Sequence, residues 1–241
     1  MGRWLDRYRA GDCARVWMEM TSLRQEFRGT AEWADAEDVC RLTMERARSN
    51  VGRLISMLPA TGFTFHRPDD ELLVAIRPAE VEELDRFERE VGPIPLALRV
   101  WMDIVGQVDL NGFNPSWDID ILDPLVVQVP IDYVWSEYAM WSDDRGTKWD
   151  EGPFRVEIAP DWLHKANISG GAPYSMVVPD ASVDSLLLWE PHQSTFVNYL
   201  RHSFECAGLP GLDPASGHRG PSKRMSLPVE LSEIVRSLEP I

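Results

Sequence analysis

The residues best suited to chemistry lie in the run 116–123, with the sequence SWDIDILD. If this run is a strand, Asp118 and Asp120 project from one face, because successive side chains of a strand point to opposite sides. Two carboxylates on one face bind a hard cation or the metal of a donor nucleotide, which is the arrangement that a hydrolase or transferase would need. The ordinary alternative is a strand edge with solvated carboxylates. No further carboxylate or asparagine pattern completes a calcium loop, so we assign Asp118 and Asp120 to partner binding.

Other catalytic patterns are absent from the sequence. The five histidines include no His-x-x-x-His or His-Glu-x-x-His spacing, so we predict no metal site. There is no Gly-x-Ser-x-Gly elbow, and Cys206 lies in an apolar helical pattern where burial makes a thiol inert. The pair Gly170-Gly171 matches neither a phosphate-binding loop nor a dinucleotide fingerprint. We therefore predict a protein that is not an enzyme and that carries no cofactor.

Tryptophan is unusually abundant, with ten residues in a chain of 241. Several lie in an acidic middle segment that has many turn residues and no strong helical period. Tryptophan beside carboxylates is typical of interface hot spots, although core packing is the alternative for any single ring. We predict a partner-binding face made of Trp117, Asp118, Asp120, Trp135, Glu137, Trp141, Asp143, Asp144 and Trp149.

The charge of the chain indicates what such a face would bind. Formal net charge is −15, and residues 76–241 hold 27 of the 39 acidic groups but only 13 of the 24 basic ones. Such a surface repels nucleic acid and attracts a basic protein, whose association it accelerates. Solubility alone is the alternative reason for the acidic surplus. We expect a basic protein partner, no nucleic acid and no membrane.

The amino-terminal residues have helical spacing. One or two short helices are expected within residues 3–26, and a longer one over residues 36–58, begun by Asp35 and ended by Pro59 and Gly62. Four arginines of this helix fit an ordinary solvated face: Arg41, Arg46, Arg48 and Arg53. Residues 1–75 are therefore expected to form a helical region.

The pattern changes after residue 76. Helices are expected over residues 78–91 and from Pro95 to Gly106, followed by the turn Asn111-Gly112. Short runs that favour strands come next, at residues 125–129, 154–158, 174–178 and 186–189. Helices over residues 194–206 and 228–238 then flank a Gly- and Pro-rich linker. The predicted class is α+β, with a small, mostly antiparallel sheet packed against helices.

Residues 76–211 resemble the SUKH superfamily, which is named for a cell-wall regulator and for bacterial immunity proteins. The segment 81–88 (VEELDRFE) matches the opening amphipathic helix of the family, and 91–95 (VGPIP) matches its Gly-to-Pro elbow. The pair Asn111-Gly112 corresponds to the usual turn, although residues 107–110 lengthen the path to it. The family's apolar second helix is matched by Leu98, Trp101 and Met102.

The resemblance implies a non-enzymatic binding module, often an immunity protein that neutralises a toxin, frequently a nuclease. It divides the chain into a helical region 1–75, a SUKH-like domain 76–211, and a linker with a final helix 212–241. The alternative function is a regulatory or scaffold protein that recruits an endogenous partner through the helical region. Scattered cysteines and the lack of an apolar leader predict a cytoplasmic location. The partner's identity and the oligomeric state stay open.

Overall fold

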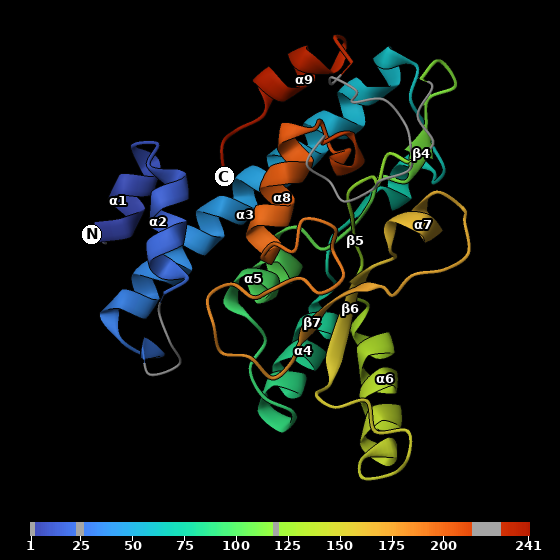
Figure 1. Cartoon of the computed structure of the whole chain (residues 1–241). Helices are drawn as coiled ribbons and strands as arrows, with labels where there is room; N and C mark the ends of the chain where they lie inside the picture. Colours follow the sequence, from blue (N-terminus) through green and yellow to red (C-terminus); the bar gives the residue numbers. More distant parts are fainter. Residues whose placement is uncertain (1–2, 23–26, 118–120, 214–227) are drawn as a thin grey trace.

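The computed structural model describes residues 3–22, 27–117, 121–213 and 228–241. It confirms the predicted α+β class, with small antiparallel sheets packed against helices (Figure 1). The helices are α1 (Arg3–Arg9), α2 (Cys13–Met20), α3 (Ala31–Met57), α4 (Pro78–Glu90), α5 (Leu96–Ile104), α6 (Ile131–Asp144), α7 (Trp162–Lys165), α8 (Phe196–Glu205) and α9 (Leu231–Ser237). The strands are β1 (Thr64–Phe65), β2 (Leu73–Val74), β3 (Gln107–Asp109), β4 (Gly112–Phe113), β5 (Val126–Val127), β6 (Arg155–Ala159) and β7 (Tyr174–Val177). Among the described helices, none has the length and apolar content needed to cross a membrane.

Helix α3 begins earlier than expected. The hydroxyl of Thr30 accepts the backbone N–H of Trp33 at 3.2 Å and caps the helix. Asp35, the predicted cap, lies inside α3, and its carboxylate accepts the N–H groups of Trp4 (2.7 Å) and Leu5 (3.2 Å) at the start of α1. The expectation was wrong because the sequence indicates that Asp35 can cap a helix but does not show which helix its side chain reaches.

Helix α3 packs against α1, α5 and α9 and crosses much of the molecule (Figure 1). The expected solvated arginine face is wrong for three of its arginines. Arg48 donates to the carbonyls of Ile104 (2.8 Å) and Val105 (3.1 Å), which are orphaned at the end of α5. Arg46 donates to the Pro240 carbonyl at 2.9 Å, and Arg53 pairs with the Glu239 carboxylate at 3.1 Å. The arginines of α3 therefore attach distant parts of the chain to the helix.

The strands form short antiparallel sheets. One has the order β2-β3-β5 and another pairs β6 with β7, while β1 pairs with β4. The N–H of Gln128 donates to the Ile158 carbonyl at 2.8 Å and joins β5 to β6. Strands β1 and β2 lie in the region 1–75 that we expected to be helical. Each is two residues long, too short for the alternation by which a sequence indicates a strand.

Most predicted later elements are confirmed, but residues 186–189 differ, and β3, β4, α6 and α7 were not predicted. Residues 186–189 form only isolated bridges, such as Leu188 to Ser175, because the chain turns at Trp189 with φ of 62°. Helix α6 was not predicted. Its aromatic side chains face more than one neighbour, since Trp135 packs on Phe87 of α4 while Trp141 packs on Phe154 before β6. Ile131, Val134, Trp135, Tyr138 and Trp141 nevertheless follow a spacing of three or four residues, so the sequence contained a helical stripe that the prediction overlooked.

A buried ion pair joins four segments of the fold. Nζ of Lys165 lies 2.7 Å from Oδ1 of Asp123, and neither side chain is exposed. The Tyr174 hydroxyl donates to the other carboxylate oxygen of Asp123 at 2.9 Å, and Lys165 donates to the Tyr199 hydroxyl at 3.4 Å. Burial alone would lower the pKa of Lys165, but the adjacent Asp123 carboxylate outweighs it and raises that pKa. Lys165 is therefore charged at neutral pH.

Replacing Lys165 by Met should destabilise the protein strongly, because it leaves the Asp123 carboxylate buried without its counter-charge. Loss of one partner of a buried pair costs about 3–5 kcal/mol in the free energy of unfolding. Urea denaturation followed by circular dichroism measures this loss.

The double variant Lys165→Met with Asp123→Asn serves as the control, because it removes both charges and Asn tolerates the positive φ of 44° at position 123. It should be more stable than the single variant. A double variant that is equally or less stable would show that the charges are not the cause.

Candidate protein-binding groove

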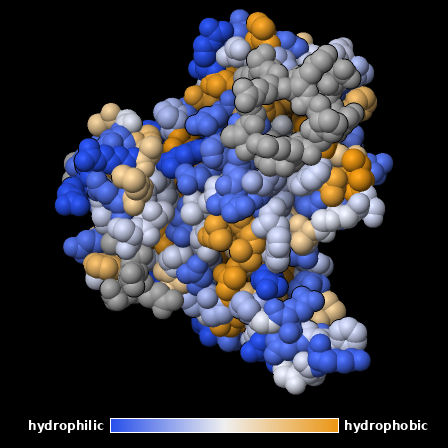
Figure 2. Space-filling model, viewed as in Figure 1, coloured by the Kyte–Doolittle hydropathy of each residue, from blue (hydrophilic) through white to orange (hydrophobic). Residues whose placement is uncertain are grey.

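A groove of about 720 Å³ lies between the last turns of α6 and the β6-β7 pair. The outline of the molecule is hollowed between α6 and the part of the chain that carries α7 (Figure 2). We call this feature the groove. It is lined by Glu137, Met140, Trp141, Asp144, Trp149, Glu151, Pro153, Phe154, Arg155, Glu157, Ala172, Pro173, Ser175 and Trp189.

Aromatic contacts hold α6 as one wall of the groove. Phe154 is buried, and the rings of Tyr138 and Trp141 lie 5.2 Å and 5.6 Å from it, centroid to centroid. The Trp141 indole N–H also donates to the Gly152 carbonyl at 2.8 Å. Aromatic pairs at these separations add stabilisation beyond their buried area. The wall is therefore fixed to the segment that leads into β6.

The loop of residues 145–153 presents Trp149 to solvent. The Asp150 carboxylate accepts the N–H groups of Gly146 and Gly152, each at 3.0 Å, and pairs with Arg145 at 2.8 Å. These backbone hydrogen bonds, helped by Arg145, lower the pKa of Asp150. Trp149 lies in this closed loop with 64% of its surface exposed. With Met140 and Trp189, which are also exposed on the groove lining, this ring contributes to an apolar patch of the kind found at binding surfaces.

Strand β7 contributes Ser175 to the groove. Its backbone pairs with Leu188, donating at 3.3 Å and accepting at 2.8 Å. The side chain is buried, yet its hydroxyl finds no hydrogen-bond partner among the described residues. A buried hydroxyl without a partner is costly, so Ser175 places an unpaired polar group beneath the surface of the groove.

Trp189 is presented by a tight turn. It is 51% exposed, and the buried Glu190 beside it organises the turn. The Glu190 carboxylate accepts the N–H of His192 at 3.1 Å and both the N–H (3.2 Å) and hydroxyl (3.1 Å) of Ser194. The Arg155 guanidinium lies 5.3 Å from the centre of the Trp189 ring. These hydrogen bonds fix the turn that carries Trp189, and about half of the Trp189 surface stays exposed to solvent.

The lining of the groove is acidic as well as aromatic. Four carboxylates, those of Glu137, Asp144, Glu151 and Glu157, face one guanidinium, that of Arg155. Glu157 accepts the hydroxyl of Tyr133 at 3.1 Å, and burial together with this carboxylate raises the pKa of Tyr133 to about 12. Met140 adds an apolar side chain that is 54% exposed. The groove combines negative charge with apolar contact area.

The structure brings together four of the nine predicted partner-binding residues: Glu137, Trp141, Asp144 and Trp149. Asp143 is exposed on α6 but does not line the groove. Trp135 packs 5.1 Å from Phe87, and Trp117 donates to Glu230 at 2.9 Å, so both lie elsewhere. Asp118 and Asp120 lie outside the described residues.

Sequence reasoning missed several lining residues, notably Met140, Arg155, Glu157, Ser175 and Trp189. Arg155 and Glu157 alternate in β6 with the buried Val156 and Ile158, so the strand pattern indicated their shared face. No comparable signal marked Ser175, because its burial and its lack of a partner appear only in the folded chain.

Metal chemistry has no evident centre in the described part of the chain, where no group of three or more His, Cys, Asp or Glu side chains could hold an ion. No protein-family model, curated protein or solved structure matches this sequence. The likeness to the SUKH superfamily therefore stays a prediction, and the groove is interpreted from its own residues.

The turn that presents Trp189 should respond to pH through His192. The His192 ring contacts Glu190 at 2.5 Å and Asp213 at 3.2 Å, and it stacks on His202 at 4.8 Å. The hydrogen bond to Glu190 raises the pKa of His192 above its ordinary value of 6.5. Because the folded pKa is the higher one, this stabilisation is complete below pH 6.5 and is lost as pH rises through the folded pKa.

Urea denaturation of the wild type and of His192→Gln across the neutral range measures this effect. The difference in free energy of unfolding should be constant on the acid side and shrink toward alkaline pH. A difference that does not depend on pH would contradict the assignment.

Proposed function

We propose that the chain is a non-enzymatic binding module that holds a basic protein in the groove. The observation that carries the proposal is the pair of exposed rings, Trp149 and Trp189, on a groove whose charged lining is mostly carboxylate. Exposed tryptophan supplies large apolar contact area, and carboxylates around it select a cationic surface.

Cation contacts within the chain support this partner chemistry. Arg145 lies over Trp141 (4.9 Å), Lys148 over Trp149 (4.7 Å), and Arg155 over Trp189 (5.3 Å). Three rings of the groove thus already contact cations of the same chain. The Lys148 side chain is flexible and can move away from the Trp149 ring. Arginine or lysine side chains of a partner can take the same ring faces, where desolvation strengthens the attraction.

The resemblance to the SUKH superfamily narrows the proposal to an immunity protein that neutralises a basic, nuclease-type toxin. A net charge of −15 supports this, because such a protein competes electrostatically with nucleic acid for the basic surface of a nuclease. Steering by charge also accelerates capture, which neutralisation of a toxin requires.

The alternative is a regulatory or scaffold protein that recruits a partner through the helical region. The observation that favours it is Met18 of α2, which is 67% exposed. Deleting the region would not test this idea, because α3 packs against α5 and β1 pairs with β4. The substitution Met18→Asp tests it in the intact fold.

The combined variant Trp149→Ala with Trp189→Ala should abolish capture of the partner, since removing a hot-spot ring costs about 2 kcal/mol or more, roughly 30-fold in Kd. Asp144→Lys should weaken binding through charge and make it less sensitive to salt. The immobilised protein is incubated with its native lysate at low and high salt, and retained proteins are identified by mass spectrometry. The Kd of the purified partner is then measured by titration calorimetry for each variant.

Asp70→Lys is the matched control for Asp144→Lys, because it makes the same charge change at an exposed position outside the groove. The proposal is supported if the groove variants no longer capture a basic partner that Asp70→Lys and Met18→Asp still capture. A partner lost only with Met18→Asp supports the scaffold instead. The proposed function would be overturned if the groove variants retain the same proteins as the wild type.

A further inference from the structure

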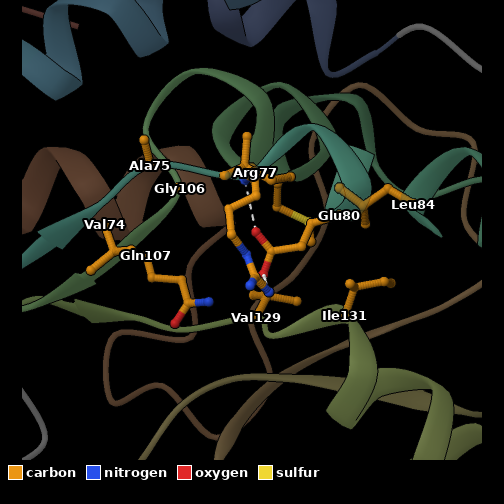
Figure 3. Close-up of a pocket in the computed structure, with 11 residues that line it drawn as sticks. Val74, Ala75, Arg77, Glu80, Leu84, Gly106, Gln107, Val129 and Ile131 are labelled. Atoms are coloured by element: carbon orange, nitrogen blue, oxygen red, sulfur yellow. Dashed lines mark hydrogen bonds and ion pairs between the residues drawn. The ribbon is translucent and has the colours of Figure 1, made fainter. Parts of the chain in front are cut away.

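A second cavity, of about 360 Å³, lies where β2, the start of α4, the α5-β3 junction and the start of α6 meet (Figure 3). We call it the pocket. It shares no lining residue with the groove, so a ligand site here does not rest on the proposed function. The pocket is lined by Val74, Ala75, Ile76, Arg77, Glu80, Leu84, Met102, Gly106, Gln107, Val129 and Ile131.

The interior of the pocket is mainly apolar. Leu84, Met102 and Ile131 are buried parts of its wall, and Val129 and Ile76 extend the same surface. Small-molecule sites commonly have volumes of roughly 300–1,000 Å³, apolar walls and few polar groups. The size and lining fit the apolar body of one small molecule.

Three polar side chains line this surface, those of Arg77, Glu80 and Gln107. Nη2 of Arg77 donates to one Glu80 oxygen at 2.8 Å, and the Arg77 backbone N–H donates to the other at 2.7 Å. Both carboxylate oxygens are therefore engaged, whereas the Arg77 side chain is 72% exposed and bonds to no other described residue. Figure 3 shows Arg77 and Glu80 side by side among the lining residues, joined by dashed lines that mark their hydrogen bonds.

Arg77 is the more accessible charge of this ion pair, because its side chain is 72% exposed and that of Glu80 only 19%. A guanidinium has five N–H donors in a planar fork that matches a carboxylate or sulfonate. An acceptor group on a ligand can use the free donors, whereas an ammonium group would meet the guanidinium's charge. The Gln107 amide adds a further donor and acceptor.

We propose that the pocket binds a small amphipathic anion, with its aliphatic or aryl body against the apolar wall and its carboxylate or sulfonate on Arg77. The protein's net charge of −15 works against any anion, so burial of the apolar body supplies most of the affinity and Arg77 selects the sign of the head group.

The test uses the dye 1-anilinonaphthalene-8-sulfonate, which joins an aryl body to a sulfonate and fluoresces in apolar sites. The native protein should bind one dye molecule saturably. Ile76→Trp, which fills the pocket, should abolish binding, and Arg77→Ala should weaken it about tenfold, the effect of one charge-assisted hydrogen bond. Helix α4 should persist in Arg77→Ala, because Glu80 still accepts the backbone N–H of residue 77.

Arg89→Ala is the matched control, because it removes the same charge from the other end of α4. Near-ultraviolet circular dichroism checks that each variant keeps its tertiary packing. Competition then tests the head group, and decanoate should displace the dye at lower concentration than decylamine.

Equal binding by wild type, Ile76→Trp and Arg77→Ala would overturn the proposal. So would displacement by decylamine as effective as that by decanoate, or loss of dye binding in the Trp149→Ala, Trp189→Ala variant, which would place the dye in the groove.

Discussion

The charge pair between Lys165 and Asp123 is the constraint on which the geometry of the groove depends. Both side chains are fully buried, so the segments that carry them must meet with their hydrogen bonds complete or leave a charge uncompensated. Tyr174 completes the cluster from β7, directly before Ser175 in the groove. Strand β7 is therefore fixed on its core side through Tyr174, which contacts the ion pair, and its next residue, Ser175, belongs to the groove lining. Apolar packing alone would fix the position of β7 less narrowly.

Much of the fold followed from sequence patterns where a single period dominates. Helices α4 and α8 and strands β6 and β7 lie within a residue or two of the expected ranges. Three of them, α4, α8 and β6, bury one regular face, and β7 is a short, almost fully buried run. The failures share another cause. The contacts of Asp35 with α1 and of Arg48 with α5 join residues far apart in sequence, and local spacing contains no information about them. Short paired strands such as β1 depend in the same way on distant partners.

Some residues that line the groove were among the predicted binding residues and others were not, because helix α6 was not predicted. On α6, Glu137, Met140, Trp141 and Asp144 follow a spacing of three or four residues and share one face, which lines the groove. Trp135 lies on another face and packs toward α4. Without the helix, aromatic and acidic residues of this segment looked equivalent. Trp189 joins them only because the turn at Glu190 brings its ring there.

Helix α6 contributes residues to both the pocket and the groove. Its first residue, Ile131, lines the pocket, and its last turns form a wall of the groove. A regular helix transmits a displacement along its axis, because its backbone hydrogen bonds keep its residues in fixed relation. An occupant of the pocket that shifts α6 also changes the width of the groove. Thermodynamic reciprocity then makes a partner in the groove alter the affinity of the pocket by the same factor. If both cavities take occupants, α6 is the element through which a displacement at one would reach the other.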